Sequence, residues 1–252
     1  MGVSIAPRAE SGTVVPVYQL ARPERWPDDD CRDLGSLICP LNVLMSKRKK
    51  YDERCVRCFM KEDLCICALI PTISLTTKLI VIVGKREAQV PTNTGRLATL
   101  ALKNSVTLIR GDTERPYCLS EHLPHDHHHL LLYPSAEAPV LTTEYMSQFS
   151  KPCTLVVPDG NWRQANKMRK RDLVMGSLQV VKVAPGIPSE YKVRKENHID
   201  GLATIEAIAR ALGVIEGPEV QRKLEDLLNV MVNRTLLSRG MRTGLEVSSK
   251  ST

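Results

Sequence analysis

The chain has 252 residues, of which 42% are apolar, so it can bury the core of one large domain with small appendages. It has no run of the roughly 18 to 20 apolar residues that a membrane helix needs and no signal-peptide pattern at its N-terminus, so we expect a soluble, cytoplasmic protein without a membrane partner. The net charge of +7 and the pI near 9.0 favour anionic partners such as RNA, although many basic proteins have no such partner.

Residues 1–44 are rich in Pro, Arg and Asp and show no sustained apolar period, which predicts a disordered extension. Met45 is followed by a basic run at 46–50 and then by a cysteine cluster. We therefore hypothesise that translation begins at Met45. Mass spectrometry of the protein from its source would test this start, and an intact Met1 end would contradict it.

Four of the eight cysteines lie within thirteen positions, as Cys55, Cys58, Cys65 and Cys67. A CxxC turn brings two thiolates to one ion, and the second pair completes the tetrahedron that Zn²⁺ prefers. Because four sulfurs leave no open coordination position, we predict a structural zinc site in a segment at 45–77. An iron–sulfur cluster, a redox CxxC and unliganded thiols are the alternatives.

From residue 78 onward, short apolar runs alternate with stretches of helical periodicity. The predicted strands are 79–83, 106–110, 130–133, 154–157 and 180–183. The predicted helices are 95–103, 161–171, 204–212 and a final helix that starts near Pro218. This alternation predicts an α/β fold, a mostly parallel sheet with helices on both faces and ligand loops at the carboxyl ends of the strands. Residues after 240 are expected to form a flexible tail.

Three loops share that expected edge of the sheet. Asp159 lies between a strand and a helix, where a carboxylate either faces a ligand or caps the helix. The loop at 91–96 precedes a predicted helix, and the loop at 133–135 follows a predicted strand. Each loop consists of ordinary turn residues, but three loops on one edge indicate a pocket.

The helix that follows this edge has a basic face. Arg163, Lys167 and Lys170 align at helical spacing just after Trp162. This face can hold an RNA backbone, or it can simply be a solvated surface. The five His at 122–129 are interpreted as a flexible surface loop without a catalytic role.

Five ordered segments resemble the DTW-domain proteins, a family of tRNA-uridine aminocarboxypropyltransferases, and the likeness runs from about Arg54 to Leu237. The segments are CVRCFMKEDLCIC at 55–67, EAQVPTNTGRLATLAL at 87–102, LLLYPSAEA at 130–138, VVPDGNWRQANKM at 156–168 and VRKENHIDGLATIEAIARAL at 193–212. The resemblance implies a catalytic domain at 78–240 with a SPOUT-like fold, in which the chain can be knotted. It also implies transfer of the 3-amino-3-carboxypropyl group from S-adenosylmethionine to N3 of a uridine in tRNA, with release of methylthioadenosine.

The resemblance also implies roles for single residues. Asp159 is the candidate general base for the N3 proton, and Trp162 is the candidate stacking platform for adenine or uracil, although a core Trp is the alternative. The residues expected to bind the donor are Asn93, Gly95, Arg96, Tyr133, Pro134, Ser135, Asp159, Gly160, Asn161, Thr204 and Glu206. Those expected to bind tRNA phosphates are Arg163, Lys167, Lys170 and Arg194.

Two positions depart from the family pattern. Asn161 replaces the usual Thr or Ser, and Gly84 stands where many members have His, three residues before Glu87. A SPOUT-type RNA methyltransferase and a non-catalytic, zinc-bearing RNA-binding protein remain the alternative functions. The sequence leaves open which tRNA uridine is modified and how many copies of the chain assemble.

Overall fold

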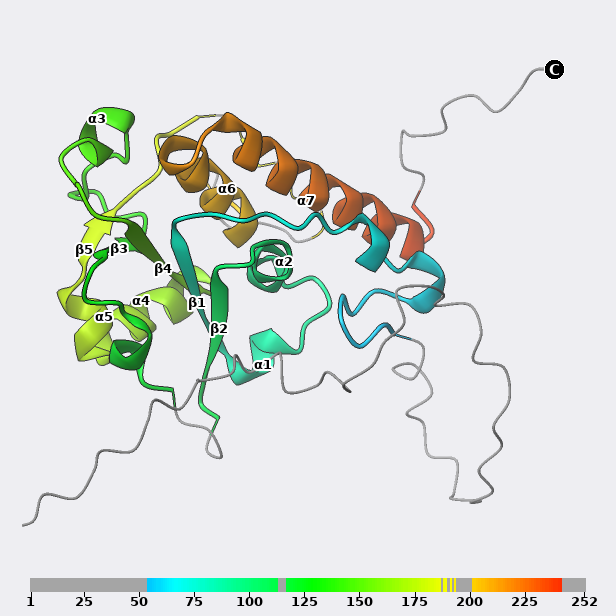
Figure 1. Cartoon of the computed structure of the whole chain (residues 1–252). Helices are drawn as coiled ribbons and strands as arrows, with labels where there is room; N and C mark the ends of the chain where they lie inside the picture. The colour runs from blue at the N-terminus through cyan, green and yellow to red at the C-terminus, as the bar shows by residue number, and fades with distance from the viewer. Residues whose placement is uncertain are drawn as a thin grey trace, which may run out of the picture. The chain divides into compact units, whose positions relative to one another are not determined.

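Five parallel strands form one sheet in the computed structural model, which describes residues 54–112, 117–186, 188–189, 191, 193 and 201–241. The strands are β1 (Lys78–Gly84), β2 (Ser105–Arg110), β3 (His128–Leu132), β4 (Cys153–Asp159) and β5 (Gln179–Val181). Their order is β2-β1-β4-β3-β5, and every neighbouring pair is parallel (Figure 1). All five predicted strands are confirmed, with ends that shift by one or two residues. The predicted extension at 1–44 and nearly all of the predicted tail lie outside the described residues.

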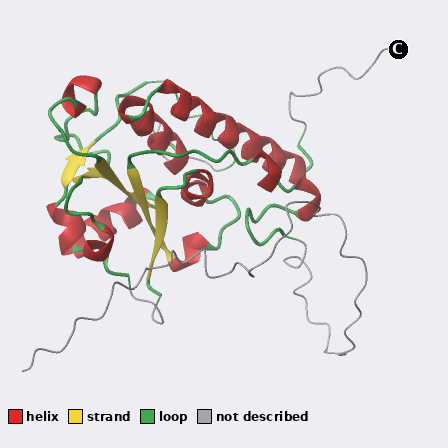
Figure 2. Cartoon of the chain, in the orientation of Figure 1, coloured by secondary structure: helices red, strands yellow, loops and turns green. Residues whose placement is uncertain are grey.

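Helices cover both faces of the sheet, as predicted (Figure 2). Successive strand residues point to opposite faces, so Leu79 and Val81 belong to one core cluster and Ile80 and Ile82 to the other. The first cluster includes residues from α2 (Thr94–Ala101), α6 (Thr204–Ile215) and α7 (Pro218–Ser238). The second includes residues from α4 (Trp162–Arg171) and α5 (Leu173–Ser177). The strands are apolar on both sides because both sides are buried.

The long helices match the predicted ones. The predicted inward face of α6 is confirmed, because Ile205, Ile208, Ala209 and Leu212 are fully buried. The sequence reading missed α5 and two more short helices, α1 (Lys85–Ala88) and α3 (Thr143–Met146). Among the helices of the described residues, none combines the length and apolar character that a membrane span requires.

The strand order reverses between β1 and β4, and we call the carboxyl edge of the sheet at this reversal the candidate ligand crevice. The chain leaves β1 toward β2, on the side of the sheet that α2 covers, and leaves β4 toward β5, on the side that α4 covers. Ligands of open α/β sheets bind outside the carboxyl ends of the strands at such a reversal. Val83 of β1 is in register with Asp159 of β4, whereas the pairing of β3 with β4 ends at Val156. Asp159 therefore lies at the carboxyl edge where a ligand is expected.

Candidate active site

Asp159 is a buried carboxylate, 4% exposed, at the last position of β4. Its Oδ2 accepts a hydrogen bond of 2.5 Å from Asn93 Nδ2, and its Oδ1 accepts a short hydrogen bond from the Thr204 hydroxyl. The N-cap of α4 is Asn161, so the interpretation of Asp159 as the helix cap is wrong. Asp159 instead joins the end of β4 to the start of α2 and the start of α6.

Gly95 gives Asp159 the space for this arrangement. A Cβ on Gly95 would lie 2.7 Å from Asp159 Oδ2 and 3.1 Å from a Val81 methyl carbon. Asn93, 4% exposed, caps α2 by accepting the Arg96 N–H at 2.7 Å while its amide donates to Asp159. The predicted loop at 91–96 is thus packed against the predicted acid, and any side chain larger than hydrogen at position 95 would push the two apart.

The turn after Asp159 is fixed by its own residues. Gly160 has φ +151°, and a Cβ there would lie 2.8 Å from Gln164 Oε1. Asn161 accepts the Gln164 N–H at 2.9 Å, and Gln164 Oε1 accepts the Asn161 N–H at 2.8 Å. Asn, Thr and Ser all serve as N-caps, so Asn161 performs the capping that the usual hydroxyl residue can perform.

The start of α6 brings Thr204 and Glu206 to the same region. The buried Glu206 carboxylate accepts the Ala203 N–H at 2.7 Å and the Ser189 hydroxyl at 2.6 Å. Tyr191, two residues after Ser189, donates a hydrogen bond from its hydroxyl to the Thr92 carbonyl at 2.9 Å. Glu206 therefore stabilises the α6 terminus, and its direct contact with the donor stays a prediction.

Trp162 lies at the surface beside this crevice. The indole is 50% exposed and stacks on Tyr133, with ring centroids 5.3 Å apart and planes inclined by 24°. Arg169 lies on the same helix as Trp162, seven residues later, and its guanidinium is 4.9 Å from the centre of the Tyr133 ring. The interpretation of Trp162 as a core residue is wrong. The sequence placed Arg169 beside the basic face of this helix but did not predict its contact with Tyr133, although spacing by seven residues puts it on the Trp162 side of α4.

The loop after β3 supplies Tyr133 and the two residues that follow it. Tyr133 is buried, which raises the pKa of its hydroxyl, while the positive charge of Arg169 opposes that rise. Pro134 is exposed, and the Ser135 N–H donates to the Tyr133 carbonyl at 2.9 Å. The predicted donor loop at 133–135 is therefore a tight turn that presents Trp162 with a ring to stack on.

The Arg96 side chain lies inside the protein and contacts its backbone. The side chain is 4% exposed, and its guanidinium donates to the carbonyl oxygens of Ala88, Pro91 and Cys58 at 3.2 to 3.4 Å. These contacts connect elements of the protein to one another. A direct contact between the Arg96 side chain and the donor stays a prediction.

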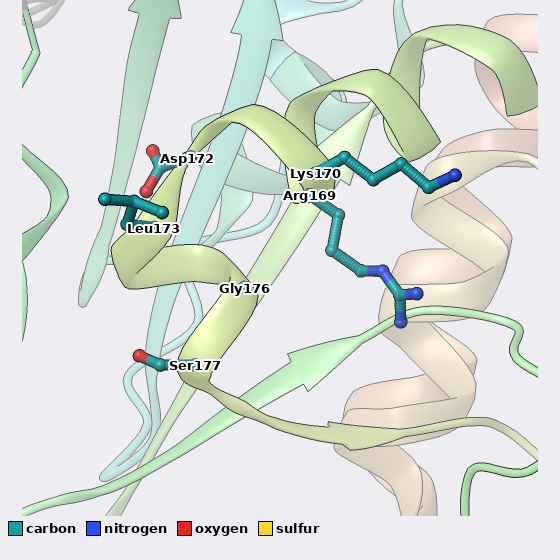
Figure 3. Close-up of a pocket in the computed structure, with 6 residues that line it drawn as sticks. All are labelled: Arg169, Lys170, Asp172, Leu173, Gly176 and Ser177. Carbon is teal, nitrogen blue, oxygen red and sulfur yellow. The ribbon is translucent and has the colours of Figure 1, made fainter.

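The basic face of α4 is open to solvent. Arg163, Lys167 and Lys170 are exposed, and the described residues offer them no ion pair. Figure 3 shows the residues that line a pocket at the end of α4, with Arg169 and Lys170 on one side and Asp172 and Leu173 on the other. That pocket is lined by Arg169, Lys170, Asp172, Leu173, Gly176 and Ser177. Arg194 lies outside the described residues.

The four clustered cysteines meet at one point. All four sulfurs lie within 4.8 Å of one another, with Cys55 Sγ 3.4 Å from Cys67 Sγ and Cys58 Sγ 3.7 Å from Cys65 Sγ. Thiolates 2.3 Å from a tetrahedral ion stand about 3.8 Å apart, so the cluster fits Zn²⁺. Among the described residues, this is the one group of His, Cys, Asp and Glu with metal-ligand spacing.

The shifted pKa values of these thiols also favour a cation at the centre of the cluster. A hydrogen bond from Cys67 is the main cause that lowers the pKa of the Cys58 thiol to about 4, whereas burial raises the pKa of Cys65 to about 11. Interaction with Cys58 raises the pKa of Cys67 further still. Ionised Cys58 therefore opposes ionisation of Cys67, and a bound dication would offset that repulsion.

The histidines of 122–129 do not converge. His127 Nδ1 lies 2.9 Å from the Thr154 hydroxyl, His129 Nε2 lies 2.7 Å from the Pro124 carbonyl, and the His128 ring packs on Phe149. His128 and His129 begin β3, so the prediction of a loop was wrong for these two residues. The absence of a catalytic role for these histidines stays a prediction.

The family model for the DTW domain matches residues 52–236, which include the cysteine cluster, the sheet and all three loops of the crevice. The chain belongs to the DTW-domain family. Within the matched range, the turn from Asp159 to Trp162 joins the last residue of β4 to the first residue of α4.

Several curated proteins are similar to this DTW-domain chain. A protein of Macaca fascicularis named tRNA-uridine aminocarboxypropyltransferase 2 is 27% identical in an alignment of 195 residues that covers 75% of this chain and 63% of that protein. The mouse protein of the same name is 26% identical and is matched over 56% of its length. The chain thus spans less than two thirds of these two relatives. A protein of Arabidopsis thaliana named tRNA-uridine aminocarboxypropyltransferase A is 27% identical, over 71% of this chain and 79% of that protein.

A solved structure also matches. It is titled as the SAM-dependent rRNA:acp-transferase Tsr3 from Vulcanisaeta distributa, with 17% identity and a TM-score of 0.40. The match covers 65% of this chain and 79% of that chain. The knot expected from a SPOUT-like fold stays a prediction.

Proposed function

We propose that this chain transfers the 3-amino-3-carboxypropyl group of S-adenosylmethionine to N3 of a uridine in tRNA. The observation that carries the proposal is the position of Asp159, buried at the reversal of the strand order and bonded to the loops of α2 and α6. The names of the similar proteins support the same reaction.

The reaction forms one bond and breaks one. The N3–H proton leaves uridine, N3 bonds to the methionine side-chain carbon next to the sulfonium, and that carbon–sulfur bond breaks to release methylthioadenosine. Three carbons on the sulfonium can react in principle. The crevice selects among them by the carbon that it holds in line with N3, because near-attack geometry decides which substitution is fast.

The Asp159 carboxylate has two candidate contributions. It can take the N3 proton, or it can hold the donor loops in place while its negative charge complements the sulfonium. Each oxygen accepts one protein hydrogen bond, from Asn93 or from Thr204, and keeps a second lone pair through which it can take the N3 proton. The two contributions differ in their effect on donor affinity. Loss of the second contribution would weaken donor binding, whereas loss of the first would not.

The exposed side of the turn would receive the RNA. Trp162 is half exposed on a fixed partner, and an aromatic face in that setting stacks on a base with little loss of side-chain freedom. Arg163, Lys167 and Lys170 extend from the same helix start, where they would meet phosphates. The cysteine cluster would hold a structural Zn²⁺ that folds residues 55–67.

Incubation with unmodified tRNA and S-adenosylmethionine, followed by nucleoside mass spectrometry, tests the proposal. We expect aminocarboxypropyl-uridine together with an equal amount of methylthioadenosine. Methylated uridine would identify a methyltransferase instead. Binding of tRNA without either product would identify an RNA-binding protein.

A further inference from the structure

Arg96 is a buried cation that connects the cysteine segment to the proposed donor loop. Its Nη1 donates to the Ala88 carbonyl at 3.3 Å, and its Nη2 donates to the carbonyls of Pro91 and Cys58 at 3.2 and 3.4 Å. A guanidinium presents several donors in one plane and can serve three carbonyls together, which an ammonium on a flexible stem does poorly. One side chain therefore binds the backbone of the segment that precedes β1 in the chain and of the segment that follows it.

The Arg96 guanidinium also stacks on a ring of the cysteine turn. Its Cζ lies 3.8 Å from the centre of the Phe59 ring, an arrangement that gains strength where water is excluded. Phe59 has φ +61°, which bulky residues rarely adopt. The turn is closed by the Phe59 N–H on the Cys55 carbonyl at 2.8 Å. The same closure that brings Cys55 toward Cys58 thus sets the position of the ring under Arg96.

The backbone of Arg96 continues the connection toward the crevice. Its N–H donates to Asn93 Oδ1 at 2.7 Å, and the Asn93 amide donates to Asp159 at 2.5 Å. Apart from the partly buried Phe59, the side chains of this path are buried, with Cys58, Asn93, Arg96 and Asp159 each 4% exposed. Two hydrogen bonds therefore separate the residue that contacts the cysteine turn from the acid of the proposed site.

We infer that Arg96 is a positioning residue through which the closed, metal-bound cysteine turn orders the loop at 91–96. Because that loop belongs to the proposed donor site, the effect on donor binding rests on the proposed function. The ordering of the loop itself does not. Coupling between two sites is reciprocal, so the donor must strengthen metal binding by the same factor by which the metal strengthens donor binding.

Amide hydrogen exchange of the zinc-loaded chain tests the ordering without any activity measurement. We expect peptides over 90–96 to exchange at least tenfold faster after zinc is removed by a chelator, and equally fast in zinc-loaded Arg96→Gln. Peptides over β4 should keep their protection in both samples. The matched control is Arg222→Gln, on an exposed part of α7, which should exchange like the parent chain.

Two further variants keep the test decisive if Arg96→Gln fails to fold. Arg96→Lys retains the charge without the planar fork, and Phe59→Leu removes the ring while leaving the three carbonyl contacts. Both should speed exchange at 90–96 in the presence of zinc, by less than Arg96→Gln. Full protection of 90–96 in both variants, with zinc bound, would overturn the inference.

Titration of S-adenosylmethionine in the same samples separates this inference from the proposed function. We expect the parent chain to bind the donor more tightly with zinc, by about 5- to 150-fold as in typical coupled sites, and the Arg96 variants to lose that dependence. A parent chain that binds no donor at all would reject the proposed function while the exchange result still decides the ordering. Donor binding that depends on zinc equally in the parent chain and in Arg96→Lys would reject the role of Arg96.

Discussion

Asp159 and Trp162 lie three residues apart but on opposite sides of one turn, and their surroundings differ in almost every respect. Asp159 is 4% exposed, with hydrogen bonds to both oxygens, whereas Trp162 is 50% exposed and held on one neighbour by stacking. Asp159 belongs to a packed region in which its contacts come from the protein itself. Trp162 belongs to a surface that can accept a large polyanion. A small donor can use a rigid crevice, while a folded RNA needs an open face.

The largest effect is expected from Asp159→Asn. The substitution keeps the shape, but it removes the charge and turns one acceptor into a donor that faces the Asn93 amide or the Thr204 hydroxyl. We expect transfer to fall about 10³-fold, as for the loss of a preorganised electrostatic contact. Donor titration then separates the roles, because a pure base leaves donor affinity intact and an anchor does not. A variant with the parent rate would show that neither role exists.

Gly95→Ala should disturb the same packed region by size alone. Its Cβ would lie 2.7 Å from Asp159 Oδ2, and overpacking of this kind costs about 1–3 kcal/mol. We expect a lower melting temperature and about tenfold weaker donor binding. Gly84→Ala is the matched control, since a Cβ at Gly84 meets no heavy atom within 4 Å. Equal behaviour of the two variants would mean that the contact between 95 and 159 is unimportant.

On the exposed side of the turn, Trp162→Ala should weaken the binding of tRNA without changing the affinity for the donor. Loss of one stacked base costs about 1–3 kcal/mol, or roughly 5- to 150-fold in transfer at low tRNA concentration. Trp162→Phe should recover part of that loss, and Leu237→Ala, a partly exposed apolar residue of α7, is the control. Donor affinity that falls with Trp162→Ala would instead assign the indole to the adenine of the donor.

The smallest effect per residue is expected from the basic face. Replacing Arg163, Lys167 and Lys170 together by Gln should leave the rate at saturating tRNA unchanged while lowering the salt dependence of tRNA binding by about 2–3 in the log–log slope. Filter binding over a range of salt concentrations measures that slope. A pair of changes on α7, Arg222→Gln with Lys223→Gln, should leave it alone, and an unchanged slope in the triple variant would remove α4 from the RNA interface.

Local patterns predicted the fold well, because each strand is a short apolar run and each long helix has a 3.6-residue period. The order of the strands was not predictable in this way. β4 lies between β1 and β3, an insertion that depends on packing across some 75 residues. The four-residue helices α1 and α3 were missed because so few residues cannot show a period. The predicted strand ended at residue 157, and proline is unusual inside a sheet. In the structure β4 nevertheless continues through Pro158 and Asp159.

The candidate site was predictable in its members but not in their contacts. The DTW resemblance indicated Asn93, Thr204 and Asp159, and the structure brings these three together. Nothing local indicates that Thr204, 45 residues later, donates to Asp159. Arg96 shows the opposite case, because an Arg in a predicted ligand loop is read as a ligand contact. Its burial against Phe59 and three carbonyls is visible only in three dimensions.

A structure of the chain with S-adenosylmethionine or methylthioadenosine bound tests the central claim most directly. The account predicts the ligand at the carboxyl edge of the sheet, against the loops at 91–96 and 133–135 and the Asp159 turn, with the sulfur on the side nearest that carboxylate. A donor bound at the other end of the strands, or in the pocket beside Ser177, would contradict it.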